Sequence, residues 1–267
     1  MASFFGEVRD LSSRAVDDDE TEDYPVFTLT SEVTDDFEKF KSQCELVLFA
    51  VGDISTAFVK CYFCHDDTKL LMTVNYLCDR NDEESLLTCH IKNSIYSKQL
   101  KACSVYSINS NVAVCEILSN VPEEINVNLC SRVLKHLPCA RAVVLTTCHM
   151  SAYKCVNPND SETSFLRSLA TSQYLMNNTC KIPTLSPPNF LANFPAAVLT
   201  EFEVTNKPAV AVICYVDSNS LDSVSVEVFE RILDEDFVSG VSVNSDAKHR
   251  LANYTAVQQS CISNLYT

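Results

Sequence analysis

The chain has 267 residues, of which 46% are hydrophobic and 21% are charged, so it can bury a sizeable core and is not largely disordered. Its 35 acidic and 20 basic residues give a net charge of −15, which disfavours nucleic acid and membrane surfaces as partners. No apolar run approaches the roughly 18–20 residues of a membrane span, and the start shows no targeting segment. We therefore expect a cytoplasmic protein, with the nucleus left open as a second location.

Fourteen cysteines occur in the chain, and they lie mostly inside apolar runs such as 114–117 and 212–215. In a chain of this size, without an export signal, such cysteines are typical of small buried hydrophobic residues in a reducing compartment. We do not expect a disulfide framework.

The first part of the chain is polar and contains the acidic run 17–20. This composition predicts a disordered acidic tail over 1–34, with ordered structure beginning just before Glu45. The apolar run 46–51 then predicts a strand buried on both faces. Asp53 and Ser55 are candidate caps for the helix that follows.

Further along, the pattern predicts a strand over 70–77 and a hairpin formed by 100–108 and 112–118 around Asn109-Ser110-Asn111. Pro122 is typical of a helix start, and the apolar spacing from Leu129 to Leu137 continues that helix until Pro138 ends it.

The second half begins with a buried strand over 142–145, and the segment 151–188 is expected to be rich in loops. Asn193 is a candidate cap for a helix that continues to Val204. The run 209–216 is the most strand-like of the chain. The last two predicted helices cover 224–233 and 246–259.

Strands that alternate with helices predict an α/β fold, and the hairpin makes the sheet mixed. We predict a single-domain layered sandwich with a mostly buried central sheet and flanking helices. The expected organisation is an acidic tail over 1–34, an α/β domain over 35–260 and a flexible C-terminal tail over 261–267.

Glycines are scarce: the chain has 3, at Gly6, Gly52 and Gly240. A dinucleotide or phosphate loop needs several glycines close together so that backbone N–H groups reach the phosphates. No such cluster occurs, and neither do the hydrolase elbow and the zinc-protease motif. The sequence therefore favours a protein that is not an enzyme and has no cofactor and no metal site.

Two other classes of protein remain open. Cys148 and His149 adjoin at a predicted strand end, where a nucleophile and base would serve an α/β enzyme of nucleoside-processing or hydrolase type. Cys61 and Cys64, with His65, have the spacing of a redox or metal site. Tyr62 and Phe63 between the two cysteines favour an apolar helix face instead.

The chain ends in Leu265-Tyr266-Thr267, a hydrophobic residue, a tyrosine and a last residue with its carboxylate. The leucine fills an apolar shelf, the tyrosine provides a ring to bury and a hydroxyl to hydrogen-bond, and a terminal carboxylate suits a basic pocket. The pattern is compatible with binding to another protein, and the resemblance described next implies that these three residues are the partner-binding site.

Several segments resemble the proteasome assembly chaperone family. They are 1–8, the Phe-Leu-Arg segment at 164–169, the helix of 194–199, the strand of 207–215, the segment 226–233 and the Asn264–Thr267 ending. The resemblance implies a chaperone that works as a heterodimer with a second chaperone subunit. It further implies that the chain binds proteasome α subunits, promotes assembly of the α ring, and anchors Leu265, Tyr266 and Thr267 in a pocket between α subunits.

Overall fold

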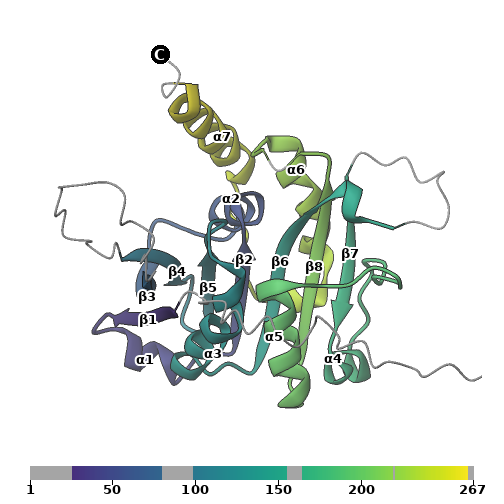
Figure 1. Cartoon of the computed structure of the whole chain (residues 1–267). Coiled ribbons are helices and arrows are strands. Elements are labelled where there is room, and N and C mark those ends of the chain that lie inside the picture. Colours follow the sequence, from purple (N-terminus) through teal and green to yellow (C-terminus); the bar gives the residue numbers. More distant parts are fainter. Residues whose placement is uncertain (1–25, 80–98, 155–163, 219, 264–267) are drawn as a thin grey trace, which may run out of the picture.

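The computed structural model describes residues 26–79, 99–154, 164–218 and 220–263 (Figure 1). Its strands are β1 Val26–Val33, β2 Leu46–Val51, β3 Lys69–Asp79, β4 Leu100–Ser107, β5 Val112–Ile117, β6 Arg141–His149, β7 Phe165–Ala170 and β8 Ala209–Val216. Its α-helices are α1 Phe37–Lys41, α2 Asp53–Tyr62, α3 Asn126–His136, α4 Ser172–Asn177, α5 Asn193–Val204, α6 Ser223–Glu227 and α7 Ala247–Ser263. Short 3-10 helices are η1 Glu123–Ile125, η2 Met150–Ala152, η3 Val228–Asp234 and η4 Asp236–Val238.

The described strands form one sheet of eight, in the order β1-β3-β4-β5-β2-β6-β8-β7. The central strands β5, β2, β6 and β8 are parallel, while β3, β4 and the two edge strands β1 and β7 pair antiparallel with their neighbours. The predicted mixed sheet is therefore confirmed. All eight residues of β8 are buried, because helices cover both faces of the parallel part.

Alternation along β2 divides the core into two layers. Leu46 and Leu48 face a cluster that includes Phe58 of α2, Phe229 of η3 and Leu251 of α7. Val47 and Phe49, between them in sequence, face the other cluster, formed with α1, α3 and α5. Since successive strand residues point to opposite faces, an uninterrupted apolar run serves both layers. The layered α/β sandwich predicted from the sequence is confirmed (Figure 1).

The structure corrects the start of ordered structure, which we had placed just before Glu45. β1 and α1 precede that point. In β1 the side chains alternate between exposed and half-buried, because only one face of this edge strand packs against the core. Phe27 and Leu29 pack against the core, and the alternating Thr28 and Thr30 face outward. The acidic run 17–20 lies outside the described residues.

A second correction concerns 151–188, which we had expected to be rich in loops. It contains β7 and α4. β7 is an edge strand with two polar positions, Arg167 and Ser168, among apolar ones, and its neighbour β8 supplies the apolar packing. Tertiary pairing rather than local propensity makes this segment a strand.

Both predicted helix caps are wrong. The residue before α2 is Gly52, with φ of 86°, a conformation that glycine adopts without steric cost, and neither Asp53 nor Ser55 caps the helix with its side chain. Asn193 is the first residue of α5 rather than its cap. Its side chain donates instead to Glu123 Oε1 at 3.1 Å. The predicted 224–233 helix is divided into α6 and η3.

Candidate interaction site

The predicted partner-binding residues Leu265, Tyr266 and Thr267 lie outside the described residues. The structure does describe α7, the helix that leads to them. It begins at Ala247, one residue later than predicted, and extends to Ser263, four residues further than predicted. In Figure 1 this helix leads away from the sheet toward the C-terminal end of the chain. The way α7 is held therefore decides where the tail begins.

One stripe of α7 holds the helix to the body. Ala247, Leu251 and Thr255 are buried at four-residue spacing, which places them on one side of the helix. Leu251 belongs to the core cluster around Phe58 of α2, and Tyr254 packs against its rim. Arg250 is half-buried, and the remaining positions whose burial is described, such as Ala252, are exposed. The attachment is thus one-sided.

Polar contacts fix the start of α7 to the end of α2. The Arg250 guanidinium donates to the carbonyl of Cys64 at 2.7 Å, and the backbone N–H of Asn244 donates to the carbonyl of Tyr62 at 2.7 Å. The carbonyls at the end of a helix lack intrahelical partners, so both bonds satisfy groups that the helix leaves open. The bond from Arg250 is also charge-assisted.

Glu230 of η3 contacts both of these helices. Its Oε1 lies 3.2 Å from Lys248 Nζ of α7 and accepts a hydrogen bond from the hydroxyl of Tyr62 in α2. Burial, together with this bond to a carboxylate, raises the pKa of Tyr62, so the hydroxyl stays protonated as a donor. The lysine is 72% exposed, and its contribution is correspondingly small. The network orients α7 more than it stabilises the fold.

An ion pair between a half-buried lysine and a buried carboxylate lies near the same helix. Lys60 Nζ of α2 lies 3.0 Å from Glu116 Oε2 of β5, whose side chain is 6% exposed. Burial raises the pKa of Glu116, although the lysine acts against this shift. Tyr254 of α7 is close enough to influence the pKa of Lys60. The pair therefore belongs to the surface on which α7 rests.

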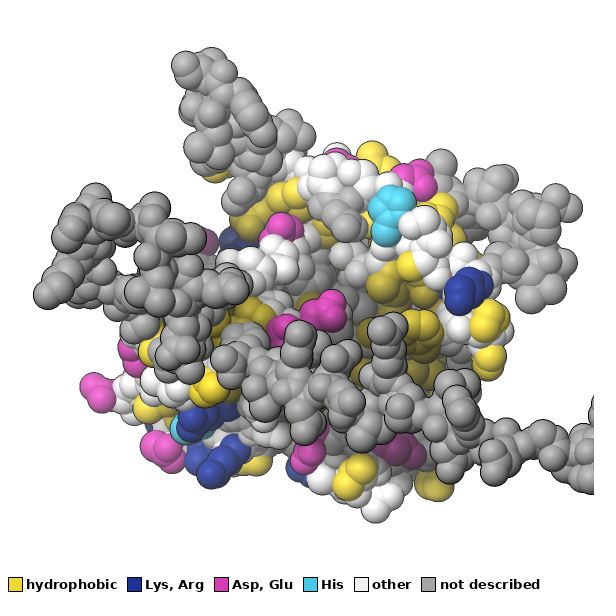
Figure 2. All heavy atoms as spheres, in the orientation of Figure 1, with side chains coloured by type: hydrophobic (Ala, Val, Ile, Leu, Met, Phe, Trp, Pro, Cys, Tyr) yellow, Lys and Arg dark blue, Asp and Glu magenta, His cyan; other side chains and the backbone are white. Residues whose placement is uncertain are grey.

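The Cys148–His149 pair of the enzyme alternative is not assembled. Neighbouring residues of β6 point to opposite faces. Cys148 lines a cavity of about 440 Å³ at the carboxyl ends of β2 and β6, but His149 does not line it. The His149 ring hydrogen-bonds Ser151 at 2.7 Å instead, and burial raises the pKa of the Cys148 thiol. Figure 2 shows acidic side chains beside the hollow on this face, whereas lysines and arginines gather over α1 and α3.

Cys61 and Cys64 are buried near the end of α2 and belong to the core. Burial raises the pKa of both thiols, that of Cys64 to about 12, so neither is activated as a thiolate. Within the described ranges, no three His, Cys, Asp or Glu side chains are placed to hold a metal ion. A helix long and apolar enough to cross a membrane is likewise not found in that part of the chain.

The apolar residues of the helix around Pro195 were compatible with either core packing or a partner interface. In the structure one face of this helix packs into the core. Phe194, Val198 and Phe202 are buried in the second cluster, and Phe194 packs on Phe49 with ring centroids 5.5 Å apart. Val204, at the last turn, is 74% exposed. The apolar residues at helical spacing in this helix are therefore explained by packing on the sheet.

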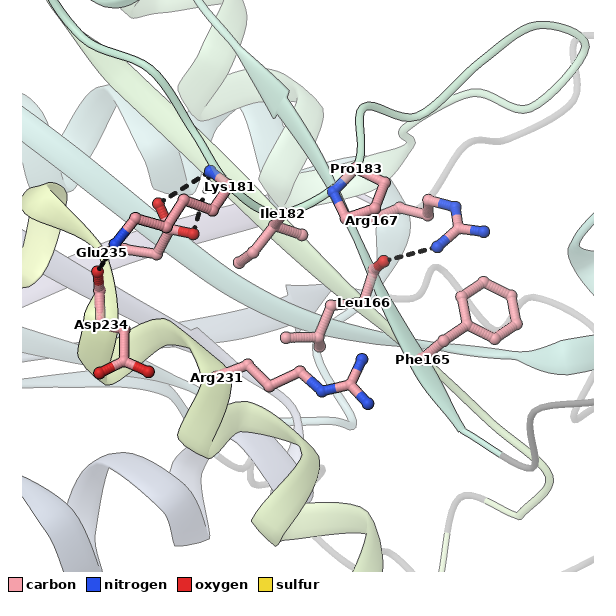
Figure 3. Close-up of a pocket in the computed structure, with 9 residues that line it drawn as sticks. All are labelled: Phe165, Leu166, Arg167, Lys181, Ile182, Pro183, Arg231, Asp234 and Glu235. Atoms are coloured by element: carbon pink, nitrogen blue, oxygen red, sulfur yellow. Dashed lines mark hydrogen bonds between the residues drawn. The ribbon is translucent and has the colours of Figure 1, made fainter.

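The sequence did not indicate a cavity of about 500 Å³ at the outer edge of β7 (Figure 3). Arg167 of β7 and Arg231 of η3 both line it, beside Leu166 and Ile182. The two arginines are 64 positions apart in the sequence, so only the tertiary structure brings them together. The sequence feature nearest to this cavity is the Phe-Leu-Arg segment, which at the level of sequence is evidence only of a family resemblance.

Comparisons with known proteins agree with the resemblance. A family model described as "Proteasome assembly chaperone 4" matches residues 26–267. The chain is 30% identical over 298 residues to "Proteasome assembly chaperone 1" of Xenopus tropicalis, with all of both chains covered. It is 27% identical to the protein of that name from Homo sapiens, over 85% of this chain and 78% of the relative.

Solved structures share the fold at low sequence identity. Pyrococcus furiosus PbaA, "an archaeal homolog of proteasome-assembly chaperone", is 9% identical with a TM-score of 0.55 and covers 91% of this chain and 93% of its own. Pyrococcus furiosus PbaB, "an archaeal proteasome activator", is 7% identical with a TM-score of 0.56, over 90% of this chain and 99% of its own.

Proposed function

The chain belongs to the proteasome assembly chaperone 1 family, and from this premise we propose that it assembles the α ring of the proteasome core as a heterodimer with a second chaperone subunit. The named relatives are assembly chaperones rather than enzymes, so the expected non-enzymatic role is confirmed. We propose that the chain binds proteasome α subunits and that Leu265, Tyr266 and Thr267 anchor it in a pocket between them. It would do so in the cytoplasm, with the nucleus as a second location.

The observation that supports the anchor best is the geometry of α7. The helix has 17 residues and is therefore about 25 Å long. Among residues 247–257, whose burial is described, the last buried position is Thr255, about half-way along the helix. The first half is held by α2 and η3, and the second half continues toward the tail. Because the helix leads away from the sheet (Figure 1), it can present a terminal peptide at a distance from the body, as insertion into a pocket of another protein requires.

The tail is too weak to act alone. Burying Leu265 and Tyr266 gives about 1.5–3 kcal/mol each, and a charge-assisted bond to the carboxylate adds roughly 1.5–3 kcal/mol. Association and ordering cost at least about 4 kcal/mol. The net value of about 1–4 kcal/mol corresponds to millimolar affinity or weaker. The chain therefore needs a second contact, from its own body or from a partner subunit, which raises the effective concentration of the tail.

Weak separate contacts suit a chaperone that must leave the finished ring. The combined binding is strong while all contacts are made, and it weakens in steps as individual contacts are displaced.

The partners are tested by purification of the chain with an N-terminal tag, which leaves the C-terminal tail free. We expect a second chaperone subunit in a one-to-one ratio, together with proteasome α subunits. Recovery of the chain by itself, with neither partner, would contradict the proposed function.

A further inference from the structure

The outer edge of β7 is covered over only part of its length. At Ser168 the N–H donates to the carbonyl of Pro183 at 2.8 Å, and the carbonyl accepts from the N–H of Leu185 at 2.7 Å. Ser168 therefore directs both backbone groups away from β8 and toward residues 183–185, which we call the covering segment. That segment makes a single parallel bridge with the strand, between Ser168 and Thr184.

Two residues earlier in β7, the same edge lacks this cover. Backbone groups along a strand repeat their direction every second residue, so the N–H and carbonyl of Leu166 also point outward. The covering segment has turned away at this point, because Lys181 donates its N–H to the Glu235 carboxylate at 3.1 Å. The Leu166 carbonyl accepts from Arg167 Nη1 at 2.9 Å.

The N–H of Leu166 has no acceptor among the residues that the structure describes. Leu166 is 2% exposed. Buried backbone donors in proteins are almost always paired. A donor left open in the wall of a cavity therefore indicates a place for an acceptor from another molecule.

Two guanidinium groups lie on either side of this backbone position (Figure 3). Arg167 is held in place, with its guanidinium 4.5 Å from the centre of the Phe165 ring and its Nε donating to the Tyr153 hydroxyl at 3.2 Å. Arg231 reaches in from η3 and is exposed. In the described part of the chain Arg231 makes no hydrogen bond and no ion pair.

The acidic residues that line the cavity do not neutralise these arginines. The Glu235 carboxylate is used by the N–H of Lys181. Lys181 Nζ donates to the carbonyl of Asp234 at 2.7 Å, and in Figure 3 the Asp234 carboxylate points away from Arg231. The lining has three basic side chains, of Arg167, Lys181 and Arg231, and two acidic ones, which is a local excess of positive charge in a chain with 35 acidic and 20 basic residues.

We propose that this cavity is a docking site for an extended, acidic peptide segment of a protein partner. The segment adds to the free edge of β7, and one of its carbonyls accepts the Leu166 N–H, as in recognition by strand addition. A Glu or Asp side chain of the segment meets Arg231, with Arg167 beside it, because a guanidinium matches a carboxylate in a bidentate manner. The volume of about 500 Å³ is within the usual range for ligand sites.

The strand edge favours a peptide over a free anion. Inorganic phosphate would satisfy the guanidinium groups, but it would not use the apolar wall formed by Phe165, Leu166 and Ile182. The site lies on β7, whereas the tail leaves from α7. It does not depend on the proposed anchoring by the tail, and each can fail without the other.

The test uses the full chain and two fluorescein-labelled probe peptides of alternating valine and threonine, with glutamate at the two central positions in one and glutamine in the other. Fluorescence anisotropy gives the affinities, and NMR of the 15N-labelled chain follows the Leu166 amide. We expect the glutamate peptide to bind at least tenfold more tightly than the glutamine peptide and to shift the Leu166 amide signal. Raising the salt concentration should reduce this preference.

Arg231→Gln should abolish the preference for glutamate, and Arg231→Lys should restore only part of it, since lysine keeps the charge but not the fork. Lys39→Gln is the matched control, because it removes one exposed positive charge on α1 and should change nothing. Equal binding of the two peptides, or an unchanged preference in Arg231→Gln, would overturn the proposal. So would full competition by millimolar inorganic phosphate with no shift of the Leu166 amide.

Discussion

Leu251 is the residue on which the attachment of α7 depends most. It is 1% exposed and packs into the core cluster that includes Phe58. Truncation of a buried leucine costs about 2–5 kcal/mol. Because α7 is held on one side only, its surroundings can relax, and we expect Leu251→Ala to cost about 2–3 kcal/mol. Alanine is the better helix former, which offsets only a few tenths of a kcal/mol.

The loss should be local. Terminal helices that are held by few contacts open without unfolding of the core, so the amides of α7 should exchange faster while those of β8 do not. A change of about 2–3 kcal/mol corresponds to a roughly 30- to 150-fold fall in protection. Hydrogen exchange measured by mass spectrometry resolves this in peptides that cover 247–257 and 209–216.

Ala252→Gln is the control for this experiment, since Ala252 is exposed on the same helix and glutamine is a good helix former. It should leave the exchange of both segments unchanged. Protection of α7 that stays the same in Leu251→Ala would show that the helix is not held by its buried stripe. An equal rise of exchange in α7 and β8 would show that α7 is part of the global folding unit instead.

Two further predictions concern buried ionisable groups. Lys60→Met should lower the free energy of unfolding by about 3 kcal/mol in urea denaturation, because it leaves Glu116 buried without its cation. A second change, Glu116→Gln, should recover part of the loss. A Lys60→Met chain as stable as the wild type would contradict this account. Burial raises the pKa of the Cys44, Cys64 and Cys130 thiols to about 12. At pH 8 a thiol reagent should therefore leave these three cysteines unmodified in the native chain and modify them after unfolding. Their rapid modification in the native chain would refute this prediction.

The sequence predicts best those elements whose residues are buried on both faces. β2, β6 and β8 are central strands, and their continuous apolar runs reflect helices on both sides of the sheet. Edge elements are harder, because half of their residues face water. β1 alternates, with Phe27 and Leu29 inward and threonines outward, and the acidic residues before it concealed this alternation.

The site is predictable only in part, for a similar reason. The proposed anchor is contiguous, so the sequence alone is enough to predict Leu265, Tyr266 and Thr267, and they remain a prediction because they lie outside the described residues. The cavity at β7 combines Arg167 with Arg231, and no local pattern links residues so far apart. The Cys148–His149 pair shows the opposite error, because residues adjacent in a strand point to opposite faces and sequence proximity is misleading there.

The measurement that tests the central claim most directly compares the full chain with a chain that lacks Leu265–Thr267, both with an N-terminal tag and both bound to the second chaperone subunit. The amount of proteasome α subunits that co-purifies is the readout, with hydrogen exchange as a check that the fold is intact. Tyr266→Phe is the matched variant, since it keeps the ring and loses the hydroxyl. We predict that the deletion abolishes or severely weakens capture of α subunits, with Tyr266→Phe between the deletion and the full chain. Unchanged capture after the deletion, in a chain that still binds its chaperone partner, would contradict the account.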